Sequence, residues 1–229
     1  MRTLYSLVFL ALLPFVTLRL FIKGRSLPGY RERVSERFGR YDSIAISGEL
    51  IWIHAVSVGE CEAAFPLIRR IRSEWPELNV LMTCTTATGS SRIQAVLSDS
   101  VIHVYLPYDI PWFVSRFLDH FKPMLGIVME TEIWPNLFTE ASRRNIPIVI
   151  ANGRLSDRSV RGYARIKALL QPALESVRAV AAQSSEDALR YRQLGLAESR
   201  VQTVGNIKFD ISWTEDQARD SQELRMRLF

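Results

Sequence analysis

Short apolar runs alternate with amphipathic stretches along the chain after Tyr41. The apolar runs are rich in β-branched residues and predict buried strands at 51–54, 80–84, 101–106, 125–129, 146–151, 179–182 and 201–204. Apolar residues at helical spacing predict helices at 60–73, 89–97, 112–121, 135–144, 161–170 and 185–194. This regular alternation predicts an α/β fold with a doubly wound, mostly parallel, Rossmann-like sheet, which we place at residues 49–212.

A long apolar segment precedes this domain at residues 4–22, with Pro14 inside it and Arg19 near its end. Nineteen residues that rise about 1.5 Å each nearly match the hydrocarbon thickness of a bilayer. A cleaved signal peptide is the alternative, but no small-residue cleavage site precedes the basic residues that follow. We therefore predict an uncleaved N-terminal membrane anchor over residues 1–24, which either crosses the membrane once or is inserted halfway.

The positive charge of the chain is concentrated at its N-terminus. Residues 1–40 contain eight of the 29 Lys and Arg residues and only two Glu, so the remainder is about neutral. Such an excess directly after an apolar segment predicts that the following domain faces the cytoplasm. Residues 25–48 would form a basic juxtamembrane segment, with 31–40 along the anionic lipids of the inner membrane. The rest of the chain has no basic stripe of groove size, which argues against a nucleic-acid partner.

The sequence lacks the usual signatures of metal and nucleotide cofactors. Cys61 and Cys84 have no CxxC or Cys/His ligand spacing, so no metal site is predicted and a reduced, cytosolic state is the default. Cys61 is either a reactive thiol or a small buried apolar residue, and burial is the favoured interpretation. Neither G-x-G-x-x-G nor a Walker A motif occurs, so no tightly bound nucleotide cofactor is predicted.

Polar residues gather just past the predicted strand ends, which meet at one edge of a parallel sheet. Ser57-Val58-Gly59-Glu60 forms a tight turn into the first helix of the domain. Glu60 is there either a helix cap or a general base, because the helix dipole favours its charged form. Glu130 follows the strand at 125–129 and faces the same crevice. Two converging carboxylates suit sugar chemistry, in which one takes a proton and the other opposes positive charge on the ring.

Four further residues complete the candidate site. Trp134 offers a flat apolar wall, although tryptophan is more often part of a core. Asn152 and Arg154 follow the fifth predicted strand and are either ligands or ordinary turn residues. Lys208 ends the last strand and is either a mobile point charge for a phosphate or a solvated surface lysine.

These segments together resemble a known family. His54-Ala-Val-Ser-Val-Gly-Glu60, Glu130-Thr-Glu-Ile-Trp-Pro-Asn136, Asn152-Gly-Arg-Leu-Ser156, Arg158-Ser159 and Gly205-Asn-Ile-Lys-Phe-Asp210 are similar to the 3-deoxy-D-manno-octulosonic acid (Kdo) transferases of Gram-negative bacteria. The resemblance covers nearly the whole chain. It implies the acceptor-binding half of a two-domain GT-B glycosyltransferase that transfers Kdo from CMP-Kdo to a lipid A precursor. The reaction belongs to lipopolysaccharide synthesis at the cytoplasmic face of the inner membrane.

The resemblance also implies roles for residues at matching positions. Glu60 would be the catalytic base, while Glu130 and Lys208 would stabilise the transition state. The residues expected to bind substrate are Ser57, Gly59, Trp134, Asn152 and Arg154. Arg154 and the basic segment suit the phosphates of the acceptor. CMP-Kdo is a donor substrate, and no cofactor is implied.

The chain ends at Phe229, soon after the last of these motifs. The resemblance implies that residues 213–229 begin a linker towards a C-terminal donor domain that the sequence does not include. We expect the chain without that domain to bind acceptor and to turn over slowly or not at all. Two alternatives stay open: a non-catalytic, membrane-anchored Rossmann-like binding module, and another GT-B transferase that uses a UDP-sugar.

Overall fold

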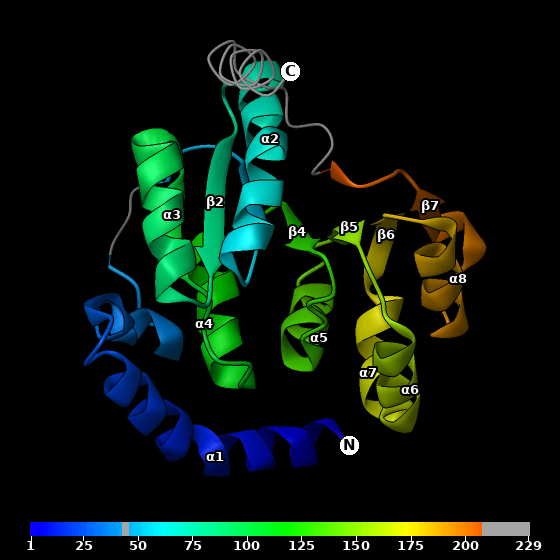
Figure 1. Cartoon of the computed structure of the whole chain (residues 1–229), viewed down its shortest axis with the longest axis horizontal. Coiled ribbons are helices and arrows are strands. Elements are labelled where there is room, and N and C mark those ends of the chain that lie inside the picture. Colours follow the sequence, from blue (N-terminus) through cyan, green and yellow to red (C-terminus); the bar gives the residue numbers. More distant parts are fainter. Residues whose placement is uncertain (43–45, 208–229) are drawn as a thin grey trace, which may run out of the picture.

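A computed structural model of the chain describes residues 1–42 and 46–207, which form an α/β domain with an N-terminal helix (Figure 1). Its seven-stranded sheet is parallel throughout and has the strand order β3-β2-β1-β4-β5-β6-β7. The strands are β1 Leu50–His54, β2 Asn79–Cys84, β3 Ile102–Tyr105, β4 Leu125–Met129, β5 Ile148–Gly153, β6 Val177–Ala182 and β7 Val201–Thr203. The predicted fold class is therefore confirmed, and each predicted strand is present with ends that shift by at most two residues.

The helices connect successive strands and cover both faces of the sheet. They are α1 Arg2–Lys23, α2 Val58–Glu74, α3 Ala87–Leu97, α4 Pro111–Phe121, α5 Pro135–Arg143, α6 Asp157–Arg165, α7 Lys167–Glu175 and α8 Ser185–Gln193. Short 3₁₀ helices lie at Pro28–Tyr30, Val34–Phe38, Ser98–Ser100 and Glu198–Arg200. The helix predicted at 161–170 is instead two helices, because α6 begins earlier, where the Ser156 hydroxyl accepts from the Ser159 amide, and ends before Ile166.

Two apolar clusters hold the helices against the sheet. One cluster lies under α2 and α3 and contains Ile68 and Ile93 with Met82 of β2. The larger one lies on the opposite face, where Phe117 of α4 and Phe138 of α5 pack with Trp52 of β1. Burial on both faces explains why the strands appear in the sequence as continuous apolar runs.

Helix α1 is apolar but does not stand apart from the domain. It lies across one end of the domain (Figure 1) and, among the described residues, is the one helix long and apolar enough to cross a membrane. Only 6% of its most apolar stretch is buried. The helix is therefore docked on the domain, because polar side chains at the start of α1 tie it there.

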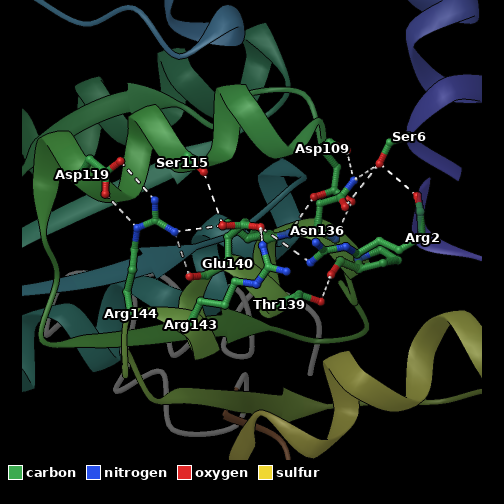
Figure 2. A network of polar contacts seen from close by, with 12 residues as sticks. Arg2, Ser6, Asp109, Ser115, Asp119, Asn136, Thr139, Glu140, Arg143 and Arg144 are labelled. Carbon is green, nitrogen blue, oxygen red and sulfur yellow. Dashed lines mark hydrogen bonds and ion pairs between the residues drawn. The ribbon is translucent and has the colours of Figure 1, made fainter.

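Those ties form the network shown in Figure 2. Tyr5 donates its hydroxyl to Asp109 at 3.0 Å, and Ser6 accepts from the side-chain amide of Asn136 at 3.1 Å. Arg2 lies 3.6 Å from Glu140, a buried carboxylate that also accepts from two arginines of its own helix region. Tyr5 and Ser6 interrupt the apolar run in the sequence, and the structure assigns them to docking.

The basic segment after α1 is also partly folded into the domain. Arg37 is buried, and Arg33 donates to the backbone oxygen of His103 at 3.0 Å. Both guanidinium groups lie over the ring of Tyr105. These two arginines therefore do not lie on the surface of the segment as predicted: they attach it to β3 and to the loop after β2, whereas Lys23, Arg25 and Arg40 stay exposed.

Candidate functional site

The candidate site lies where the strand order of the sheet reverses. The chain runs outward from β1 through β2 to β3, and then returns to pair β4 with the other side of β1. In open parallel sheets the loops on the two sides of such a reversal diverge, and the crevice between them is the usual ligand site. Glu60 follows β1 and Glu130 follows β4, so the two predicted carboxylates flank this crevice.

Glu60 is part of the N-terminal cap of α2. The hydroxyl of Ser57 accepts from the Glu60 amide at 3.3 Å and donates to its carboxylate at 2.9 Å, while the Val56 amide donates to the other carboxylate oxygen at 2.7 Å. This reciprocal arrangement resembles a capping box. Gly59 lies exposed in the same turn. The cap interpretation of Glu60 is therefore confirmed, and its contacts fix the direction of the carboxylate.

The electrostatics of Glu60 differ from the expectation. Burial raises the pKa of its carboxyl group, the hydrogen bonds from Val56 and Ser57 lower it, and the charge of Glu130 raises it. The net shift is upward, because desolvation outweighs the donors at the helix N-terminus. The donors at the start of the helix favour the charged form of Glu60, as expected, but burial, which the prediction did not include, outweighs them. A raised pKa makes the carboxylate a stronger base near neutral pH.

Glu130 is held by its backbone. Its amide donates to the Ala151 oxygen at 2.9 Å, and its carbonyl oxygen accepts from the Tyr191 hydroxyl at 3.0 Å. Its φ of 55° lies in the left-handed region, which is uncommon for a residue with a side chain and recurs at functional sites. The structure thus brings Glu130 close enough to Glu60 for their charges to interact.

A third carboxylate, Glu132, joins this pair, and sequence reasoning did not select it. Burial, followed by the charges of Glu60 and Glu130, raises the pKa of Glu132 to about 7. Glu130-Thr131-Glu132 was visible as a motif, but nothing in the sequence showed which carboxylate would be desolvated.

No group of His, Cys, Asp or Glu suited to a metal ion occurs among residues 1–42 and 46–207.

Asn152 and Arg154 lie on the β5 side of the crevice. Asn152 is buried with a φ of 54°, and its side-chain oxygen accepts from the Ile207 amide at 3.2 Å. Arg154 is exposed, and its backbone oxygen accepts from the Thr131 hydroxyl, which links its loop to that of Glu130. Asn152 therefore positions the segment that follows β7, while Arg154 is available to a ligand.

Trp134 is both a core residue and a wall of a cavity, the two roles that the sequence left open. It packs partly buried against the larger core and lines a cavity of about 430 Å³ between α1 and the strand ends. Lys208 lies outside the described residues. Cys61 is buried, and burial raises the pKa of its thiol, so the prediction of an apolar core residue is confirmed.

The fold and the crevice define a class of protein: a Rossmann-like, GT-B-like α/β domain with carboxylates at the strand reversal. A family model described as 3-deoxy-D-manno-octulosonic-acid transferase (kdotransferase) matches residues 32–211. A 3-deoxy-D-manno-octulosonic acid transferase of Haemophilus influenzae is 40% identical over 98% of this chain and 53% of its own length. The protein of that name from Bordetella pertussis is 34% identical over 95% of this chain and 52% of its own. The chain belongs to the Kdo transferase family, a family of glycosyltransferases.

Solved structures of low sequence identity share the fold. UDP-GlcNAc 2-epimerase of Neisseria meningitidis, bound to UDP-GlcNAc, has a TM-score of 0.53 at 13% identity, over 76% of this chain and 54% of its own. S. aureus MnaA with UDP has a TM-score of 0.54 at 13% identity, over 71% of this chain and 46% of its own. The chain spans about half the length of the curated relatives it matches.

Proposed function

We propose that this domain is the acceptor side of a glycosyltransferase that transfers Kdo from CMP-Kdo to a lipid A precursor. Membership of the Kdo transferase family supports the reaction class. The observation that carries the proposal is the pair Glu60 and Glu130, which flank the strand reversal and interact electrostatically. Because the relatives are about twice as long, we expect donor-binding residues outside this chain to be needed for turnover.

In the proposed reaction Glu60 takes the proton from an acceptor hydroxyl. The freed oxygen forms a bond to the anomeric carbon of Kdo, and the bond from that carbon to the CMP phosphate breaks with its electron pair leaving on CMP. Positive charge develops on the sugar ring, and Glu130 opposes it. Lys208 would neutralise the charge building on the departing phosphate. Ser57 and Val56 hold the base in one orientation, since both donate to its carboxylate.

We also propose that α1 lies in the interfacial plane of the inner membrane, at its cytoplasmic face, and does not cross it. One face of α1 docks on the domain through Tyr5 and Ser6, and its other face exposes large apolar side chains. The exposed ones include Leu4, Leu7, Leu10, Phe15, Leu18 and Ile22. A helix with this division inserts its apolar face at the boundary of headgroups and acyl chains.

Glu60→Gln tests the base, in a full-length protein that includes the donor-binding half. Glutamine keeps the size but loses the charge and cannot accept from both Val56 and Ser57, so we expect a stability loss of about 1 kcal/mol. We expect the rate of Kdo transfer to fall on the order of 10²-fold or more, because the basicity is gone. The measurements are transfer from CMP-Kdo to lipid A precursor, acceptor binding and thermal unfolding.

The chain offers a matched control in Asp187→Asn. Asp187 is buried, caps α8 through Ser184 at 2.7 Å and accepts from the Leu155 amide at 2.8 Å, so it repeats the local chemistry of Glu60 at a different helix. Asp187→Asn should lower the free energy of unfolding about as much as Glu60→Gln does. It should leave the rate of Kdo transfer within a few-fold of the parent. Equal rates for the two variants would reduce Glu60 to a cap and favour the non-catalytic binding module.

A further inference from the structure

The cavity between α1 and the sheet lies beside the pair Glu60 and Glu130, since Glu132 lines it while the pair itself does not, and the segment with Tyr30 and Arg37 forms one of its walls. Its roof is α1, through Phe9, Val16 and Leu20, and its floor is formed by the loops that follow β1, β2, β3 and β4. Its volume of about 430 Å³ is within the range of ligand pockets. Most of the lining is apolar, and the cations at it are Arg37, Arg19 and Lys23.

Arg37 is the unusual member of this lining because it is a buried charge, with only 3% of its surface exposed. One nitrogen, Nη1, donates to the Thr85 oxygen at 2.9 Å, and the guanidinium carbon lies 4.0 Å from the centre of the Tyr105 ring. The other two nitrogens, Nε and Nη2, are buried and have no hydrogen-bond partner among the described residues. The contacts thus fix the plane of the group and leave its Nε/Nη2 edge buried and without a hydrogen-bond partner.

That edge has a defined chemistry. Nε–H and Nη2–H point the same way, and this pair binds two oxygens of a carboxylate or a phosphate. Among the described residues no carboxylate lies within 4 Å of Arg37, and leaving a buried charge with unsatisfied donors is costly. Two acids line the cavity, and neither forms an ion pair with Arg37 among the described residues: Asp109 accepts from the amides of Asn136 and Leu137, and burial raises the pKa of Glu132 to about 7. The Nε/Nη2 edge is therefore suited to an oxyanion supplied by a ligand.

The surroundings of Arg37 indicate what carries the oxyanion. The roof helix exposes apolar side chains to the outside and Phe9, Val16 and Leu20 to the cavity, so an acyl chain can follow α1 inward. Arg19 and Lys23 add positive charge on the same helix. We propose that the cavity beneath α1 binds the phosphate monoester of an anionic lipid, with Nε and Nη2 of Arg37 as its bidentate ligand. This deepens the proposed function and rests on it for the identity of the lipid, because the phosphorylated acceptor is one source of that group.

Arg37→Lys tests this site, since lysine keeps the charge and loses the planar fork. Binding of the whole chain is measured to phosphatidylcholine vesicles that contain phosphatidic acid, a phosphate monoester, or phosphatidylglycerol, a diester, at equal surface charge. A third set contains lipid A precursor. We expect roughly tenfold weaker binding to phosphatidic acid. The loss for phosphatidylglycerol should be smaller, because its phosphate carries a second substituent and fits a buried edge less well. A loss for lipid A precursor alone identifies the acceptor as the source, and a loss for both identifies any monoester lipid.

Two further variants keep the outcome clear. Arg40→Lys changes an exposed arginine of the same segment and should bind all vesicles like the parent. Val16→Trp fills the cavity from its roof without touching Arg37, and should repeat the selective loss even if Arg37→Lys unfolds at a lower temperature. Equal losses on monoester and diester vesicles, or normal binding by both cavity variants, would show that Arg37 only anchors its segment. Because the vesicle-binding test contains no CMP-Kdo, its result is independent of whether the protein transfers Kdo.

Discussion

At the scale of single residues, capping and catalysis are compatible in Glu60. The contacts from Val56 and Ser57 that complete the first turn of α2 also remove the rotational freedom of the carboxylate. A base that is already oriented loses no entropy when the acceptor arrives. Under the proposed function, the two interpretations of Glu60, which the sequence presents as alternatives, therefore describe one arrangement.

Glu132 gives a prediction about stability and pH. Its pKa is raised from 4.5 to about 7, so the folded protein holds a proton that the unfolded chain releases above about pH 4.5. The stability contributed by this group is complete below pH 4.5 and is lost as the pH rises through 7. Glu132→Gln removes the titration, so the variant should exceed the parent in stability at pH 8 by on the order of 1 kcal/mol.

Denaturant unfolding of both proteins between pH 5 and pH 8 measures this difference. The advantage of Glu132→Gln should shrink steadily towards pH 5. Stability curves that stay parallel over this range would mean that Glu132 ionises normally in the folded protein.

At the scale of elements, Gly126 leaves room on β4 for large side chains of the two neighbouring strands. A Cβ on this residue would lie 2.6 Å from Cδ1 of Ile148 and 2.8 Å from Cε3 of Trp52. Gly126→Ala should therefore displace the side chains of Trp52 and Ile148 and cost about 1–3 kcal/mol. Thermal unfolding measures the loss, and Kdo transfer should also fall if the displacement reaches the ends of β1 and β4, which Glu60 and Glu130 follow.

Gly162→Ala is the control for the removal of glycine flexibility. Nothing lies within 4 Å of a Cβ built at Gly162, which is in α6. Alanine favours a helix over glycine by about 1 kcal/mol, so this variant should be as stable as the parent or more so. If both variants behaved alike, close packing would not be the reason for Gly126.

The helices and strands also show which parts of the structure can be predicted from the sequence. All seven strands were predictable, because a buried parallel strand needs a continuous apolar run and such runs are hard to mistake. The break between α6 and α7 was not, since the apolar spacing at 161–170 continues across Ile166. Glu60 and Glu130 were found from their places after strands. Glu132 and Arg37 were missed, because desolvation depends on neighbours far along the chain and leaves no local pattern.

At the scale of the whole molecule, the proposed in-plane position of α1 gives a topological prediction. Thr3→Cys and Arg25→Cys place thiols at the two ends of the helix, at exposed positions. The native thiols of Cys61 and Cys84 are buried and should stay silent. In inverted inner-membrane vesicles, with the cytoplasmic face outward, an impermeant thiol reagent should label both new cysteines at similar rates. Protection of Cys at position 3 alone, relieved by detergent, would instead mean that α1 crosses the membrane.

The contacts of α1 also impose an order of events during synthesis. Tyr5 and Ser6 bind Asp109 and Asn136, partners that lie 104 and 130 residues further along the chain. At roughly 5–20 residues per second, the ribosome delivers those partners about 5–25 seconds after the helix. During that interval the apolar helix has already left the ribosome, while the residues on which it docks have not yet been made. If α1 binds the membrane as proposed, the membrane is the first surface that it meets, and the domain then completes its fold on a helix already in place.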